Sequence, residues 1–184
     1  MDRKTFLKAS LGVVAASVAG ASLRAGAEEA PCAKELENAN RESAFVNAWL
    51  TDLFAAIDAE VDPPAQVRLL EACGRGCYRR HAFKPEIARK GRGSLANLQR
   101  AYAESFESWV EDGALHIRYG KVSKGCYCPA ARNRPARPHD LHCECTKATH
   151  QTVCEMALGR PCRVEVLETV RRGGRTCHFA VRPA

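Results

Sequence analysis

The stretch LGRPCRVEVLETVRRGGRTCHFAV, residues 158–181, decides the fold. Apolar and polar residues alternate on both sides of the pair Gly173–Gly174. A period of two is typical of a half-buried strand, and a Gly-Gly pair suits a tight turn. The stretch therefore predicts an antiparallel β-hairpin over residues 163–181 that turns at Gly173–Gly174. Its inward-facing positions are Val164, Val166, Cys177, Phe179 and Val181.

The segments before this hairpin predict one more helix and two more strands. Residues 144–158 read as a helix that Gly159 closes, because glycine readily takes the left-handed conformation that ends many helices. Residues 115–119 alternate with a period of two and predict a strand. A second short strand is expected over residues 125–128, which would place Cys126 and Cys128 on one face.

The N-terminal half is helical by pattern. Apolar residues recur every fourth position over residues 35–58, and a second helix is expected to begin after the N-cap Asp62 and its two prolines. A third helix should run from the N-cap Ser94 to Asp112–Gly113. The expected fold is α+β, with N-terminal helices followed by an antiparallel sheet that contains an inserted helix and ends in a β-hairpin.

Length and composition fit one globular domain. With 184 residues, 46% hydrophobic and 27% charged, the chain has enough apolar side chains for an ordinary core. Ten cysteines are therefore more than such a core needs for its stability, which points to a chemical role for some of them.

Residues 1–27 predict an export signal. Basic residues precede a weakly apolar run, and Ala25-Gly26-Ala27 has the small-x-small form of a cleavage site. The run is shorter than the roughly 20 residues that span a bilayer. DRKTFLK, residues 2–8, resembles the twin-arginine motif, although Lys4 stands where that motif has its second arginine. We expect a periplasmic protein that meets the membrane only during export, with residues 28–184 as its single domain.

Six cysteines form three pairs that suit metal binding. Two members lie four residues apart on a predicted helix, so their sulfurs share a face, while two Cys-x-Cys pairs enclose residues 129–142. Convergence of the pairs would supply enough thiolates for zinc or an iron–sulfur cluster. We expect one metal site formed by Cys73, Cys77, Cys126, Cys128, Cys143 and Cys145.

Disulfides and a reactive thiol stay open as alternatives to a metal at these pairs. An exported protein with an even number of cysteines is a candidate for disulfides across the loop. If a thiol is reactive, Cys73 or Cys77 is the best candidate, because neighbouring arginines lower a thiol pKa. The sequence contains no nucleotide-binding loop, nucleophile elbow or zinc-protease helix. The sequence therefore does not decide whether the protein is an enzyme.

The loop between the Cys-x-Cys pairs is basic. It lacks both the basic helical stripe and the interleaved aromatic residues of nucleic-acid-binding proteins, so no nucleic-acid partner is expected. Its cationic side chains are instead candidate contacts for a ligand or an anion over a pocket that the loop would roof. These candidates are Arg132, Arg134, Arg137 and His142.

The C-terminal stretch, residues 158–181, resembles the end of the 4-vinyl reductase-type small-molecule-binding domain, in which a helix and glycine precede a Val-Glu-x-Leu strand, a Gly-Gly turn and a Cys-x-Phe-x-Val strand. With EACGRGC, CYCP and CECT, the chain from about residue 45 resembles a family of small bacterial proteins that carry the same cysteine pairs. The resemblance implies an α+β ligand-binding fold with a cysteine-bound metal, and it supplies no activity.

These observations together predict a small exported domain that binds zinc or an iron–sulfur cluster and a small-molecule ligand, in a sensing, carrier or redox role. The alternatives are a disulfide-stabilised periplasmic binding protein without a metal and a thiol-dependent enzyme. The sequence does not indicate an oligomeric state.

Overall fold

The computed structural model describes residues 31–184, and the expected export signal lies outside them. Residues 40–184 form one compact unit, to which the packing below refers. No helix among the described residues is long and apolar enough to cross a membrane. The helices are α1 (Pro31–Glu60), α2 (Pro63–Arg80), α3 (Phe83–Lys90), α4 (Leu95–Ala103) and α5 (Glu144–Leu158), the 3-10 turns are η1 (Leu141–Cys143) and η2 (Val170–Arg172), and the strands are β1 (Glu107–Glu111), β2 (Ala114–Arg118), β3 (Cys162–Glu168) and β4 (His178–Pro183).

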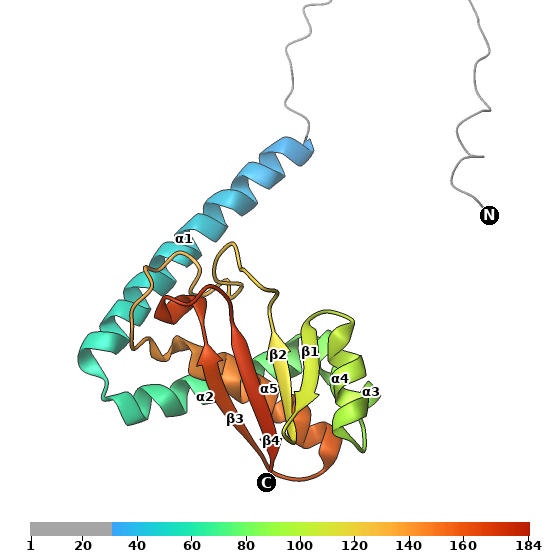
Figure 1. Ribbon diagram of the computed structural model, residues 1–184. Helices are drawn as coiled ribbons and strands as arrows, with labels where there is room; N and C mark the ends of the chain where they lie inside the picture. The colour runs from blue at the N-terminus through green and yellow to red at the C-terminus, as the bar shows by residue number, and fades with distance from the viewer. Residues whose placement is uncertain (1–30) are drawn as a thin grey trace, which may run out of the picture. The chain divides into compact units, whose positions relative to one another are not determined.

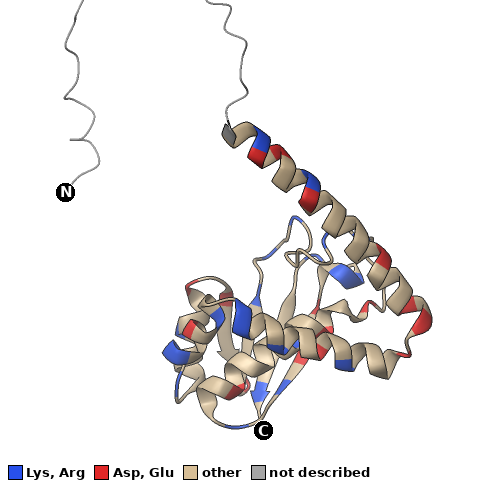
Figure 2. Cartoon of the chain, turned by 180° about the vertical axis from the view of Figure 1, so that it is seen from behind, with Lys and Arg blue, Asp and Glu red and all other residues tan. Residues whose placement is uncertain are grey.

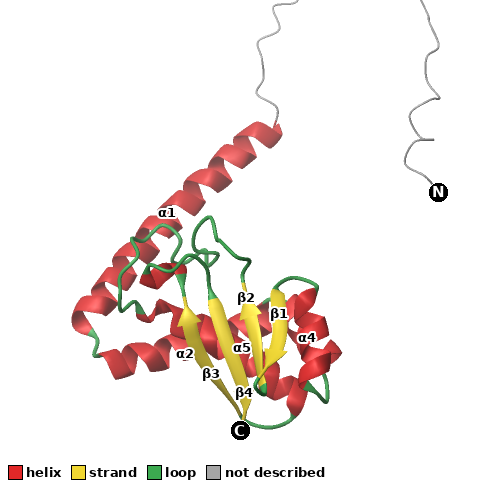
Figure 3. Ribbon diagram, viewed as in Figure 1, coloured by secondary structure: helices red, strands yellow, loops and turns green. Residues whose placement is uncertain are grey.

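The four strands form one antiparallel sheet in the order β1-β2-β4-β3. Helices α2 to α5 lie on one face of this sheet, the far face in Figure 1 and Figure 3. The α+β fold class is therefore confirmed, with helices first, a helix inserted before β3 and paired C-terminal strands.

The core lies between the sheet and the helices. Alternate strand residues such as Leu115, Ile117 and Phe179 are fully buried against α4 and α5, as the period of two predicts. From α4, Leu98 and Tyr102 complete this layer.

The opposite face of the sheet carries a polar and aromatic cluster. The indole of Trp109 stacks on the imidazole of His116 with ring centroids 5.0 Å apart, and the guanidinium of Arg118 lies 5.1 Å from the indole centroid. His116 Nδ1 in turn lies 3.0 Å from His178 Nε2, so three neighbouring strands contribute to one half-buried cluster.

The predicted starts and stops of several helices are confirmed. Asp62 accepts a hydrogen bond from the amide of Ala65 and caps α2, and Ser94 accepts one from the amide of Asn97 and caps α4. Gly159 closes α5 in the left-handed conformation with φ 66°. In α1, by contrast, the predicted apolar stripe is largely solvent-exposed, since Phe45 is 72% and Trp49 56% accessible.

The third predicted helix is wrong in its second half. Helix α4 ends at Ala103, and Trp109 lies in β1. Asp112 and Gly113, both with positive φ, form the hairpin turn between β1 and β2 instead of ending a helix. An Asp-Gly pair between two strands is a strong hairpin signal, and the helical spacing of the apolar residues concealed it.

Two further strand predictions need correction. Residues 125–128 form no strand, so Cys126 and Cys128 lie in irregular chain. The C-terminal hairpin exists, but residues 169–177 connect its arms through η2 in place of a tight Gly-Gly turn. Gly174 is required there because a Cβ atom would overlap the side chain of Glu168, which accepts hydrogen bonds from the amides of Arg175 and Thr176.

Candidate functional site

A cavity of about 790 Å³, called the central cavity below, opens between the helices and the start of the cysteine-flanked loop. Its lining is mainly apolar and aromatic, which is typical of small-molecule sites. It is lined by Cys77, His81, Phe83, Lys84, Ile87, Tyr102, Ala103, Glu104, Ser105, Phe106, Glu107, Tyr119, Gly120, Tyr127, Cys128, Pro129, Cys145, Thr146, Thr149, His150 and Val153.

One cysteine of each predicted pair faces the central cavity: Cys77 from α2, Cys128 from the loop and Cys145 from α5. The crossing of α2 over α5 produces this arrangement. A Cβ atom at Gly74 would overlap the carbonyl oxygen of Cys145, so only glycine permits so close an approach.

The pKa values of the thiols record their proximity. Burial is the main cause that raises the pKa of Cys145 to about 12, and the charges of Cys128, Cys77 and Cys73 contribute to this value. Burial likewise raises the pKa of Cys128, to which Cys126 and Cys77 also contribute. Five of the six predicted cysteines thus interact electrostatically around one region.

The remaining predicted cysteine, Cys143, lies deeper and has different neighbours. Burial raises its pKa to about 12, and the charges of Cys177 and Cys126 act in the same direction. Cys177 was expected to be only a buried core residue, and it is buried, yet it also interacts electrostatically with Cys126 and Cys143. Its position just before β4 gives no pattern by which the sequence could have marked it.

His142 contacts the thiol cluster directly. Its Nε2 lies 3.2 Å from the sulfur of Cys128, and its ring packs edge-on against Phe54. Burial lowers the pKa of His142 to about 4, so the imidazole is neutral near pH 7. Its Nδ1 is buried and has no hydrogen-bond partner among residues 31–184. A smaller cavity of about 60 Å³ lies beside it and is also lined by Cys73.

Two polar groups of the cavity wall were not found from the sequence. The ammonium of Lys84 donates a hydrogen bond of 2.7 Å to the sulfur of Cys77. His150 is fixed between two hydroxyls, with Nδ1 3.0 Å from Tyr102 and Nε2 3.1 Å from Tyr119. Burial lowers the pKa of His150 to about 3.

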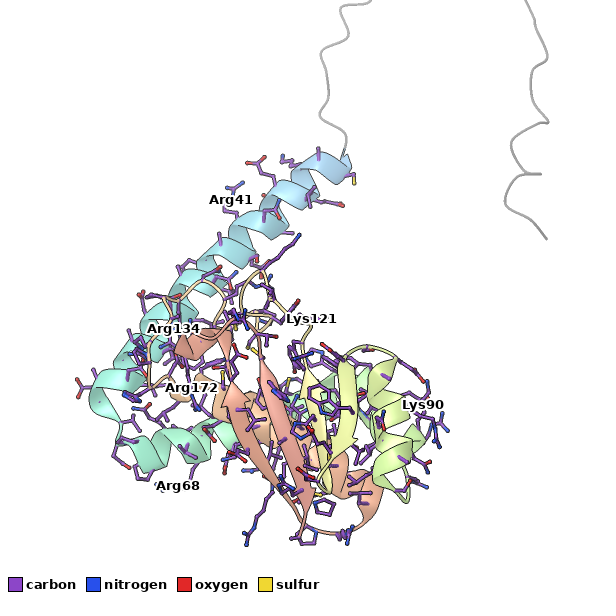
Figure 4. All side chains as sticks on the ribbon, viewed as in Figure 1. Arg41, Arg68, Lys90, Lys121, Arg134 and Arg172 are labelled. Atoms are coloured by element: carbon purple, nitrogen blue, oxygen red, sulfur yellow. The ribbon has the colours of Figure 1, made fainter. Side chains whose placement is uncertain are left out.

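The arginine-rich loop does not roof the central cavity, because only Tyr127, Cys128 and Pro129 at its start line it. Arg134, which lies beside α1 in Figure 4, and Arg137 instead form ion pairs with Asp58 of that helix. Arg132 is exposed to solvent, and His142 contacts the sulfur of Cys128.

An unexpected ion pair holds the loop in place. Arg171 and Asp140 are almost completely buried and form an ion pair, and Arg171 also donates hydrogen bonds to the carbonyl oxygens of Ala131 and Arg134. Closing a polar loop of this length has an entropic cost, and this buried ion pair offsets part of it.

The family of the chain follows from a comparison with protein-family sequences. A family of unknown function, DUF6144, matches residues 10–184. The chain belongs to this family. A comparison of this DUF6144 member with curated protein sequences finds no match.

Two solved structures resemble this DUF6144 chain. One is a trafficking protein particle complex subunit 3 from Naegleria fowleri covalently bound to palmitic acid, with 15% identity and a TM-score of 0.50, covering 79% of this chain and 96% of that one. The other is the phenol-responsive sensory domain of the transcription activator PoxR with phenol, with 12% identity and a TM-score of 0.43, covering 77% and 74%. The similarity to the Naegleria fowleri subunit concerns the fold alone.

The thiols of this DUF6144 member are all unbridged, since each of its ten cysteines lies among the described residues and is free. Within residues 31–184, no three Cys, His, Asp or Glu side chains are arranged to hold a metal ion as they stand. The structure therefore gathers the predicted thiols around one region without placing them at coordination distances.

Proposed function

We propose that this domain carries or senses a small apolar molecule and holds a soft metal ion, zinc or the iron of an iron–sulfur cluster, in the wall of the central cavity. The observation that carries the proposal is that Cys77, Cys128 and Cys145, one from each pair, face the same cavity. Thiolates and neutral imidazole are the ligands that these metals prefer.

The residues near Cys128 fit a metal of this kind. A tetrahedral zinc about 2.3 Å from sulfur and about 2.0 Å from nitrogen sets those two atoms roughly 3.5 Å apart. The sulfur of Cys128 and Nε2 of His142 are 3.2 Å apart, and the imidazole is neutral. Cys77 and Cys145 line the same cavity as Cys128, so they are the candidates for the remaining ligands. A bound cluster would supply one-electron chemistry.

The ligand half of the proposal is supported by the apolar lining and by the fold. The resemblance of residues 158–181 to the 4-vinyl reductase-type domain points to a ligand-binding fold. The Naegleria fowleri subunit of similar fold contains palmitic acid. An apolar molecule in the central cavity is the corresponding expectation for this chain.

Metal analysis together with thiol titration tests the metal. Native protein purified without oxygen should contain about one zinc or one cluster per chain, and Cys145→Ser should lose most of it. Cys32→Ser is the matched control, because Cys32 is exposed and does not line the cavity. A native protein with no metal and ten free thiols would refute the metal half of the proposal, and a deficit of two thiols for each bridge would favour the disulfide alternative.

A second candidate function, thiol-dependent catalysis, is favoured by the contact between Lys84 and Cys77, because reactive cysteines lie in electropositive, partly exposed surroundings. Iodoacetamide should then alkylate Cys77 faster than the other thiols near pH 7, and Lys84→Met should slow this reaction. Equal rates in both proteins would exclude this function.

The proposed location is the periplasm, after export through a twin-arginine-like signal. We expect the mature chain to begin at Glu28, immediately after Ala25-Gly26-Ala27. N-terminal sequencing of protein from the native cell checks this, and an intact Met1 would contradict it.

A further inference from the structure

The fixed charges of the central cavity are unbalanced. Its two lining carboxylates are both occupied, since Glu104 pairs with Lys90 at 2.6 Å and Glu107 pairs with Arg118. Lys90 lies on the outer side of the molecule in Figure 4. Among residues 31–184, the ammonium of Lys84 has no carboxylate within ion-pair distance.

The other basic group deep in the wall adds no charge. His150 is held between the hydroxyls of Tyr102 and Tyr119, and burial lowers its pKa to about 3, so it is neutral near pH 7. Lys84 is half-buried, and its ammonium donates to the sulfur of Cys77. The ammonium also lies 5.6 Å from the centroid of the Phe83 ring, which lines the cavity. Because an ammonium has three donors and only one meets the sulfur of Cys77, donors remain for a ligand.

The walls around this cation are apolar. Ile87, Phe106 and Val153 line the cavity, where Ile87 and Val153 belong to the buried core and Phe106 packs against it. A ligand that fills such a space gains from its apolar body, while a single anionic head can reach the partly desolvated ammonium. In that setting a charge-assisted hydrogen bond is stronger than one between neutral groups.

We infer that the central cavity selects a monoanionic ligand with an apolar body, whose carboxylate pairs with Lys84. The inference rests on the proposed ligand-binding function and narrows its ligand class. Basic and acidic residues are otherwise interspersed over the helical side of the molecule (Figure 2), so the selection arises from this one lysine and not from a general positive surface.

Matched acids and alcohols test the inference on the native full chain. Dodecanoate is compared with dodecan-1-ol, and 4-phenylbutyrate with 4-phenylbutan-1-ol, by isothermal titration calorimetry near neutral pH. In at least one pair the acid should bind about tenfold or more tightly than its alcohol. Lys84→Met keeps the apolar stem and removes the charge, so it should abolish this preference while the alcohol still binds.

Lys147→Met is the control variant. Lys147 is also half-buried and lies on α5, but it pairs with Glu144 and does not line the cavity, so the preference for the acid should persist. Retained alcohol binding shows that a lysine variant is folded.

Three outcomes would overturn the inference. If acid and alcohol bind the wild type equally, the cavity takes apolar ligands, the proposed function stands and the inference fails. If the acid is still preferred in Lys84→Met, another group, such as a bound metal, holds the anion. If no member of either pair binds, the inference fails together with the ligand half of the proposed function.

Discussion

At the scale of single residues, Arg171 holds the loop between the Cys-x-Cys pairs in place. It lies outside the loop that it organises, and it reaches Asp140 and two loop carbonyl groups from the connection between β3 and β4. An arginine among several in a basic segment carries no local mark of burial, because burial depends on which distant segment packs over it.

Breaking this ion pair should be costly. We expect Arg171→Met to lower the free energy of unfolding by about 3–5 kcal/mol, because Asp140 would remain buried without its counter-charge. Arg137→Met is the comparison, since the Arg137 side chain is 46% exposed and its ion pair with Asp58 should be worth no more than about 1 kcal/mol. Urea denaturation measures both, and equal losses would show that the buried pair has no special weight.

His150 should make the stability depend on pH. Its folded-state pKa of about 3 lies below the usual 6.5, so between these values the unfolded chain binds more protons. The free energy of unfolding is therefore independent of His150 titration above pH 6.5. As the pH falls from 6.5 toward 3, it decreases by at most about 1.4 kcal/mol per pH unit.

The slope of unfolding free energy against pH measures this effect. The slope between pH 6.5 and 4.5 is proportional to the number of protons taken up on unfolding. His150→Gln should reduce this number by up to one, whether or not the substitution also changes the absolute stability. His139→Gln, at an exposed position, should leave the slope as it is. An unchanged slope in His150→Gln would mean that other groups account for the acid sensitivity.

At the scale of elements, the α2–α5 crossing positions the cavity thiols, and Gly74 permits it. Gly74→Ala should cost about 1–3 kcal/mol, because its Cβ would overlap the Cys145 carbonyl group and lie 2.8 Å from the Cβ of Ala148. Gly76→Ala on the same helix meets only the flexible end of Arg80, so it should be near neutral, with a helix-propensity gain of up to about 1 kcal/mol. Thermal unfolding followed by circular dichroism compares the two, and similar losses would contradict the role of the crossing.

Elements defined by local chemistry could be predicted from the sequence. Asp62, Ser94 and Gly159 mark helix ends through hydrogen bonds and backbone conformation within a few residues, and all three act as expected. The chain from Glu107 to Glu111 could not be assigned in this way, because Trp109 continues the helical spacing of α4 while its partner strand lies beyond the Asp112 turn. Long-range pairing overrode local periodicity there.

At the scale of the whole molecule, the gathering of the cysteine pairs was only partly predictable. Spacing alone indicated that each pair acts together, and the fold brings one member of each to the same cavity. Neither the contact of Lys84 with Cys77 nor the electrostatic interaction of Cys177 with Cys143 has a sequence pattern, because both arise from segments that meet only after folding.

If the proposed metal is present, it should stabilise the whole domain. Removing it from native protein with a chelator should lower the melting temperature, and adding zinc should restore it. At a free zinc concentration one hundred times the dissociation constant, the bound metal should raise the free energy of unfolding by about 2.7 kcal/mol. Differential scanning calorimetry gives the shift. The Cys145→Ser protein should not respond, and an equal response there would place the metal elsewhere.

The two tryptophans are fluorescence probes of two different parts of the molecule. Trp49 projects into water from α1, so its emission should lie to the red and be quenched readily by iodide. Trp109 is half-buried on the sheet and stacked on His116, so its emission should lie further to the blue and be shielded from the same quencher. A Trp49→Phe protein would thus emit from the sheet alone, and its fluorescence would follow the folding of the strands without a contribution from α1.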